Sequence, residues 1–378
     1  MPRSVYINKI AKHLPNESVS NDNIEDHLGN IYNHTSKSKP IVLRSNKITN
    51  RYYAIDAQGN VTDTNAGMTA KAIKGLVSED FSLEDIDMIS TGTGTPDQLL
   101  PSHAAMVHGE LKSRPVEVNS FMGACVSGMQ ALKSAWLGVK SGEMEHAVAT
   151  GSERSSTWLH AKNYTGEFEN SNGLKEQPML AFDKEFLRWM LSDGAGAALL
   201  ESEKRGDMSL RIEWIDIISY ANELDSCMYA GSRKNEDGSL TGWSELEEKQ
   251  WANESIFALK QDVKLLASNI MRLGGRFFVE TLERHNLAPD DIDYFLPHIS
   301  SEFFRSKLHE ELARLGKEIT EDKWYTNLAS VGNVGSASIF LILEELLYSG
   351  KLKKGDKLFL CVPESARFQY AYALLTVV

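Results

Sequence analysis

Cys125 is the residue with the strongest case for covalent chemistry. It stands in Gly123-Ala124-Cys125-Val126-Ser127-Gly128, where small residues flank the thiol and a helical pattern begins directly after it. A thiol at the start of a helix lies near free N–H groups and the positive end of the helix dipole, which favour the reactive thiolate. Such a thiolate can attack a thioester carbonyl. The alternative role is that of a buried, small apolar side chain.

His298 and Asn333 are the residues that could complete a site around this thiol. His298 follows the apolar run Tyr294-Phe295-Leu296-Pro297, so we expect it at the end of a buried strand. A neutral imidazole there can act as a base or donate a hydrogen bond to a developing enolate oxygen. Asn333 would give a second neutral donor, and two such donors form an oxyanion hole. Taken singly, His298 could be structural and Asn333 an ordinary helix N-cap.

Other kinds of protein use some of the same residue types. Cysteine peptidases also use cysteine, histidine and asparagine, although usually with a different sequence around the nucleophile. An acyl-binding partner subunit without catalysis is a third class. His103 and His108 are five residues apart and lack the acidic partner of a helical zinc site. Gly92-Thr93-Gly94 does not complete a phosphate-binding loop. We therefore expect no metal and no nucleotide.

The elements that position these residues occur twice in the chain. Residues 83–89 resemble residues 289–295 at an offset of 206, and the helical stretch 127–140 resembles 336–348 at an offset of 208. Each stretch leads through Ser-Gly to an apolar strand, and glycine just past a helix is a typical stop. Alternating strands and helices predict an α/β protein with a mainly parallel sheet.

This duplication predicts where the site forms. The second offset puts Cys125 and Asn333 at equivalent strand-to-helix turns, which would meet near the axis if the two halves are related by pseudo-twofold symmetry. We place the halves at 1–205, carrying the cysteine, and 206–378, carrying the histidine and asparagine. Residues 206–260 have little match in the first half. We expect them to form a strand or two plus a loop and helix that cap the pocket.

The motifs resemble those of the β-ketoacyl-acyl carrier protein synthase III family over nearly the whole chain. The matching pieces are Gly-Ala-Cys125-Val-Ser-Gly, Pro297-His298, Gly332-Asn333-Val-Gly-Ser-Ala-Ser, Ser192-Asp-Gly-Ala-Gly-Ala-Ala and Thr95-Pro-Asp. The resemblance implies a thiolase fold, layered α-β-α-β-α and usually homodimeric, with no metal or bound redox cofactor.

The same resemblance implies a reaction and assigns residues to it. Cys125 would take an acyl group from coenzyme A or an acyl carrier protein. His298 and Asn333 would then stabilise the carbanion of a second thioester in a Claisen condensation. The oxyanion hole for the acyl intermediate would be formed by the Cys125 backbone N–H and an N–H of the C-terminal loop, at Ser365 or Ala366.

Three features depart from the family pattern. Ile299, Ser300 and Ser301 replace the usual glutamine, alanine and asparagine, and Pro363-Glu-Ser-Ala-Arg367 replaces a glycine run. The third departure is the insertion within 206–260. These changes resemble a branch of secondary metabolism, such as the ketosynthases that form dialkylresorcinols. In that branch Glu117 or Glu364 would be an extra base for condensation without decarboxylation, or else structural.

Bulk composition bears on location and partners. The three cysteines are far apart and odd in number, which argues against a disulfide framework and favours the cytoplasm. No stretch reaches the roughly 20 apolar residues of a membrane-spanning helix. The formal net charge of −12 argues against nucleic acid as a partner.

A cationic segment is the local exception to this acidic charge. It could be a solvated face or a docking surface for an acidic carrier or phosphate-bearing ligand. Its members are Lys37, Lys39, Arg44, Lys47 and Arg51.

Overall fold

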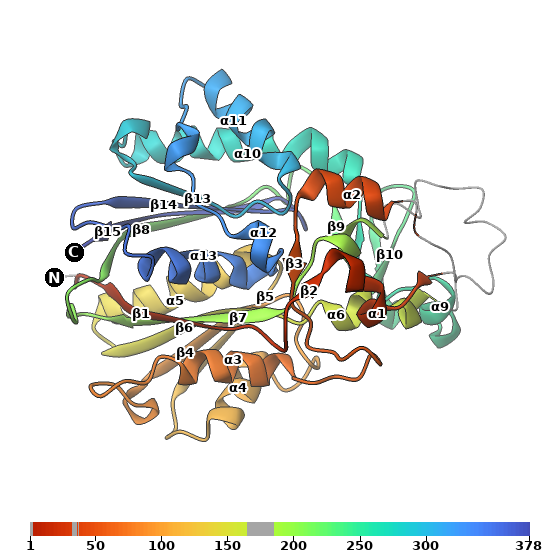
Figure 1. The fold of residues 1–378 in the computed structure, drawn as a ribbon, viewed down its shortest axis with the longest axis horizontal. Coiled ribbons are helices and arrows are strands. Elements are labelled where there is room, and N and C mark those ends of the chain that lie inside the picture. The colour runs from red at the N-terminus through yellow and green to blue at the C-terminus, as the bar shows by residue number, and fades with distance from the viewer. Residues whose placement is uncertain (1–2, 32–35, 37, 165–184) are drawn as a thin grey trace.

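The protein is a five-layered α/β structure in which two helices lie between two sheet layers (Figure 1). The computed structural model describes residues 3–31, 36, 38–164 and 185–378. Helices α5 (Val126–Ser141) and α13 (Ser338–Leu347) form the central layer. The outer layers are α3 (Asn65–Lys74) with α4 (His103–Leu111), and α10 (Val263–Arg284) with α11 (Phe303–Arg314). The layered α/β fold expected from the sequence is confirmed.

Nine strands form the sheet layers in the order β13-β14-β15-β8-β1-β7-β6-β4-β5. A short antiparallel contact, with Tyr6 opposite Arg211 and Ile7 opposite Leu210, joins β1 to β8 and links one layer to the other. The strands are β1 (Tyr6–His13), β4 (Met88–Thr93), β5 (Glu117–Met122), β6 (His146–Glu153), β7 (Gly194–Glu201), β8 (Leu210–Ser219), β13 (Tyr294–Pro297), β14 (Lys357–Glu364) and β15 (Gln369–Val377).

The sheet is mixed rather than mainly parallel. Strand β4 runs parallel to β5 and β6, and β13 runs parallel to β14. The pairs β1–β7, β6–β7, β8–β15 and β14–β15 are antiparallel. The expectation of a mainly parallel sheet was therefore wrong for the strands that follow each strand–helix–strand unit. These strands run antiparallel to a neighbour. A short connection, such as residues 365–368 between β14 and β15, reverses the chain direction.

The stop signals read from the sequence are confirmed in part. Gly142 follows α5 with φ of 87°, a left-handed conformation that glycine adopts without a steric penalty. Helix α13 ends earlier than the pattern predicted, at Leu347, and Gly350 lies in the following turn with φ of 74°.

The segment 206–260 forms β8 and then a cap made of small elements. These are β9 (Met228–Tyr229), β10 (Ser232–Lys234), β11 (Leu240–Gly242), α9 (Glu248–Asn253) and β12 (Lys260–Gln261). They lie at the same end of the molecule as α1 (Ile24–Leu28), α2 (Lys39–Asn46), β2 (Val19–Ser20), β3 (Asn50–Arg51) and α6 (Ser156–Leu159). Helix α12 (Leu328–Val331) packs against β3 nearer the middle of the molecule. The proposed boundary between the halves falls in the loop that connects β7 to β8.

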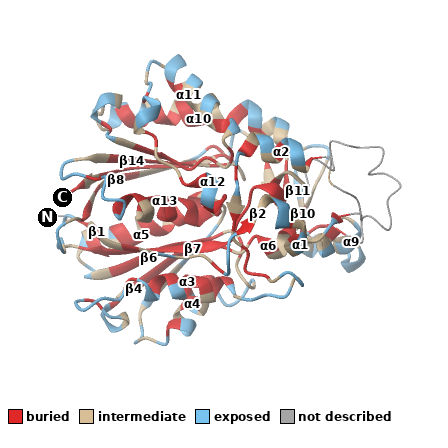
Figure 2. Cartoon of the chain, viewed as in Figure 1, coloured by how far each residue is buried: buried red, intermediate tan, exposed pale blue. Residues whose placement is uncertain are grey.

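The core is concentrated around the central helices (Figure 2). Helix α13 buries Ile339, Phe340, Leu341, Ile342 and Leu343 in succession, because sheets cover it on two sides. Among the described residues, no helix is long and apolar enough to cross a membrane.

Candidate active site

Cys125 lies between the end of β5 and the start of α5. It is the N-cap residue of α5, with helical backbone angles of −54° and −34°. A methyl group on Gly128 would lie 2.2 Å from the Ser336 carbonyl oxygen, so only glycine lets this helix approach the Asn333 turn so closely. Close packing of the two turns brings Cys125 and Asn333 to the same cavity.

Asn333 is held by backbone and side-chain hydrogen bonds. Its N–H donates to the Met190 carbonyl at 3.0 Å, and its own carbonyl accepts from the Ser192 N–H at 2.8 Å. Its side-chain Oδ1 accepts from the Gly335 N–H at 2.9 Å. Within the described part of the chain, the Nδ2 group has no acceptor and remains available to a ligand. The N-cap alternative is wrong, since the N-cap of α13 is Ala337.

His298 follows β13, as its sequence position predicted. Its N–H donates to the Cys361 carbonyl at 2.8 Å, which continues the parallel pairing of β13 with β14. The side chain is only 3% exposed, and burial lowers the pKa of His298 to about 4. The imidazole is therefore neutral at pH 7. Neither ring nitrogen has a partner among the described residues, so both can contact a ligand.

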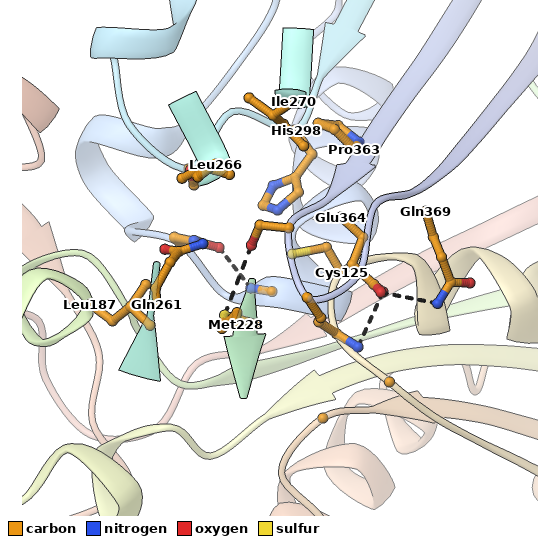
Figure 3. A pocket seen from close by; sticks show the side chains of 18 of the residues that line it. Cys125, Leu187, Met228, Gln261, Leu266, Ile270, His298, Pro363, Glu364 and Gln369 are labelled. Carbon is orange, nitrogen blue, oxygen red and sulfur yellow. Dashed lines mark hydrogen bonds between the residues drawn. The ribbon is translucent and has the colours of Figure 1, made fainter. Parts of the chain in front are cut away.

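These three side chains line one cavity of about 390 Å³, within the usual size range of ligand sites. Figure 3 shows Cys125 and His298 in this cavity. Its polar lining residues include Cys125, His298, Asn333 and Glu364. Two sets of apolar side chains form its walls. One set comes from the cap side, with Trp158, Leu187, Leu191, Met228 and Leu259, and the other from α10 and α11, with Leu266, Ile270, Met271, Phe304 and Leu308.

Comparisons with known proteins show what this chain is similar to. Residues 53–206 match the family described as beta-ketoacyl synthase, N-terminal domain, and residues 282–363 match 3-oxoacyl-[acyl-carrier-protein] synthase III C terminal. Beta-ketoacyl-[acyl-carrier-protein] synthase III of Clostridium perfringens is 26% identical over 349 residues, with 92% of each chain covered. The chain belongs to the β-ketoacyl-acyl carrier protein synthase III-like condensing enzymes. It is thus an acyltransferase, of the class that catalyses Claisen condensations.

Solved structures share the thiolase fold of this synthase III-like chain. A tetronic acid condensing enzyme, AbyA1, superposes with a TM-score of 0.76 at 21% identity and covers 98% of this chain and 99% of its own. A Xanthomonas campestris OleA variant, solved with bound lauric acid and lauroyl-CoA, superposes with a TM-score of 0.75 at 20% identity. The match covers 100% of both chains.

The electrostatics around Cys125 differ from the sequence prediction. Burial raises the pKa of the Cys125 thiol, and the nearby Glu364 and Glu153 carboxylates raise it further. Only its own backbone N–H lowers it. The sequence expectation that the helix start favours a thiolate is therefore corrected: burial and the two carboxylates outweigh that effect, and Glu364 already accepts from two N–H groups at the helix start.

The C-terminal loop of this synthase III-like chain lines the cavity with Glu364, Ser365 and Ala366. The Ala366 carbonyl accepts from the N–H groups of Cys227 at 2.9 Å and Met228 at 3.2 Å, which fixes the loop against the cap. The loop N–H that would bind the acyl oxygen stays a prediction, with Ser365 and Ala366 as the candidates.

The two suggested extra bases lie in different places. Glu364 lines the cavity, whereas Glu117 is exposed on β5 and is not among the residues that form its wall. No sequence motif pointed to Glu153, a buried carboxylate that also lines the cavity. Burial raises the pKa of Glu153 to about 7.

The cationic segment is only partly available as a docking surface. Lys37 lies outside the described residues. Arg51 is fully buried and donates to Asn21 and the Trp189 carbonyl, so its assignment to this surface was wrong. Lys39 pairs with Glu25 at 2.6 Å. Arg44 and Lys47 are exposed and form no ion pair with any described residue. A charge pattern in the sequence cannot separate surface cations from buried ones.

Proposed function

We propose that this protein condenses two acyl thioesters through an acyl intermediate on Cys125. The observation that supports this most directly is that Cys125, His298 and Asn333, far apart in the sequence, line one cavity with apolar walls. In the first half-reaction the thiol displaces coenzyme A or an acyl carrier protein from the donor. In the second, the His298 imidazole and the Asn333 Nδ2 donate hydrogen bonds to the enolate oxygen of the other thioester.

We extend the proposal to the substrate class. The two apolar walls suit alkyl chains, and the solved OleA variant holds lauric acid and lauroyl-CoA. Burial of each methylene contributes about 0.8 kcal/mol, roughly fourfold in kcat/KM. Loading should therefore improve about fourfold per methylene until the cavity is full. The departures after His298 and in the C-terminal loop support a place in secondary metabolism, such as dialkylresorcinol formation.

A homodimer is part of the proposal. Strand β5 is at the end of the sheet order and, within the described chain, pairs only with β4. An unpaired edge strand readily adds a further strand. Exposed apolar side chains occur at the end of this strand and in the loop before α4: Met122 at 66%, Leu99 at 63% and Leu100 at 85%. Since Met122 also lines the cavity, a second copy on this edge would help to close the site.

A non-catalytic, acyl-binding subunit is the second candidate. It is favoured by the raised pKa of the Cys125 thiol, because a protonated thiol is a poor nucleophile. The two candidates differ in whether a covalent bond forms.

Intact-mass measurement with a panel of acyl-coenzyme A and acyl-carrier thioesters separates these candidates. A mass gain equal to the acyl group should appear in the parent protein and be absent in Cys125→Ala. Cys227→Ala is the matched control, since Cys227 is buried outside the cavity wall, and it should load like the parent. Tight binding of acyl thioesters without any mass gain would replace the enzyme proposal by the subunit.

A further inference from the structure

Glu364 is a buried carboxylate held directly beside the proposed nucleophile. It is the last residue of β14 and is 2% exposed. Its Oε2 accepts from the Ala124 N–H and the Val126 N–H, each at 3.2 Å, and its Oε1 accepts from Gln369 Nε2 at 3.1 Å (Figure 3). Two of its contacts are therefore with the residues immediately before and after Cys125.

This arrangement leaves room for the chemistry at the thiol. The Cys125 N–H is not among the groups that Glu364 binds, so it stays available for an acyl oxygen. Gly123 has no side chain to separate the carboxylate from the cavity, and a methyl group there would lie 3.9 Å from Glu364 Oε2. Cys125 and Glu364 both line the cavity.

The Glu364 carboxylate makes the Cys125 thiol harder to deprotonate, and it can itself accept the thiol proton. A negative charge beside a buried thiol disfavours the thiolate, so attack on a thioester requires a proton acceptor at that moment. Burial raises the pKa of Glu364 toward that of the thiol, which makes it a better acceptor than an exposed carboxylate.

The other titratable groups of the cavity are less suited to this role. Glu153 accepts its hydrogen bonds from Gly94, Thr95 and Ser336, whereas Glu364 accepts from the residues on either side of Cys125. His298 has a lowered pKa of about 4 and is therefore a weak base. The Cys361 thiol has a raised pKa of about 12, and it does not accept protons in this pH range.

We propose that Glu364 is the general base that removes the Cys125 proton during acyl loading and returns it to the leaving thiol. In this step the S–H bond breaks as a carboxyl O–H bond forms, and Cys125 Sγ bonds to the thioester carbonyl carbon. The bond from that carbon to the donor sulfur then breaks, and the donor thiolate takes the proton from Glu364. The products are the acyl-enzyme and a free thiol. This inference rests on the acyl-cysteine reaction proposed above.

The competing role is a structural cap of α5, and the two roles give opposite results in Glu364→Gln. The amide keeps the shape but loses the charge. Removal of the repelling charge should lower the pKa of the Cys125 thiol and speed its alkylation by iodoacetamide. Loss of a general base should nevertheless slow acyl loading about 100-fold at pH 7, within the usual range for this kind of catalysis.

The experiment measures both rates against pH for the parent protein, Glu364→Gln and Glu364→Asp. Loading is followed by rapid quenching and intact mass, with an acyl-coenzyme A as the donor. The parent rate should rise with pH and reach a plateau as Glu364 ionises. The Glu364→Gln rate should keep rising into the alkaline range. Glu364→Asp retains a carboxylate and should recover part of the loading rate. Glu143→Gln, on the exposed loop beyond the other end of α5, is the control.

The loading measurements test the general-base role of Glu364 separately from the acyl-cysteine reaction. Equal or faster loading by Glu364→Gln overturns the general base while leaving the acyl-cysteine reaction intact. If Glu364→Gln fails to fold, Glu364→Asp decides, because a base role predicts loading with a parent-like pH plateau. Absence of loading in the parent protein would instead remove the proposed function itself.

Discussion

At the scale of single residues, we predict a division of labour within the cavity. His298→Ala and Asn333→Ala should each slow condensation about 100-fold or more, since each removes one donor to the enolate oxygen. Acyl loading on Cys125 should change less than about threefold, because neither donor contacts the first carbonyl oxygen in our proposal. Single-turnover assays that start from preloaded acyl-enzyme measure the second step alone. Equal losses in both steps would contradict the proposed roles.

The protonation state of His298 is a second prediction at this scale. Burial lowers its pKa to about 4, so the ring should stay neutral from pH 8 down to pH 5. Nitrogen NMR of histidine-labelled protein, with His298→Gln to assign the signal, measures this directly. An unfolded histidine titrates near 6.5 and takes up its proton first, so the stability that neutral His298 contributes is lost as pH falls from there toward 4. An inflection near pH 6.5 in the folded protein would contradict the burial argument.

At the scale of elements, the close approach of α5 to the Asn333 turn depends on glycine. A methyl group on Gly128 would meet the Ser336 carbonyl, which belongs to the turn before α13. Gly128→Ala should lower the free energy of unfolding by about 1–3 kcal/mol and reduce condensation more than loading, because it moves Asn333 away from Cys125.

Gly109→Ala is the matched control for this element. Gly109 is inside α4, where an added methyl group meets nothing within 4 Å. Alanine is the better helix former, so this variant should be more stable by about 0.5–1 kcal/mol. Thermal unfolding measures the stability of Gly128→Ala and Gly109→Ala. Equal changes in the two variants would contradict the close packing of Gly128 against Ser336.

Arg44 in helix α2 and Lys47, the C-cap residue of that helix, are the remaining candidates for carrier docking. Arg44→Glu with Lys47→Glu should raise KM for an acyl carrier protein and leave kcat unchanged, since docking contacts are equally strong in the ground and transition states. The effect should weaken at high salt, because these cations are exposed. Lys204→Glu, another exposed lysine, is the control. An unchanged KM for the acyl carrier protein in the double variant would exclude this surface as its docking site.

At the scale of the whole molecule, strand β5 predicts the oligomeric state. The parent protein should be a dimer by light scattering at micromolar concentration. Met122→Lys should shift it toward the monomer, since lysine on an edge strand opposes strand addition. Val77→Lys is the control, because Val77 is an apolar residue that is 42% exposed in the loop after α3. This variant should have the same molar mass by light scattering as the parent protein. A monomeric parent protein would remove the dimer from the proposal.

The sequence by itself determined the elements and the three residues for which a site was expected. Hydrophobic periodicity and stop glycines located α5 and α13 to within two residues at each end, because these signals are local. The tertiary structure decided what depends on distant neighbours. Only packing could show that Arg51 is buried and that antiparallel strands complete the sheet. Only the fold places Glu364 on the N–H groups beside Cys125, 240 and 238 residues away from its partners in the chain. Burial raises the pKa of the Cys125 thiol, and Glu364 and Glu153 raise it further, so no local pattern around Cys125 could predict it.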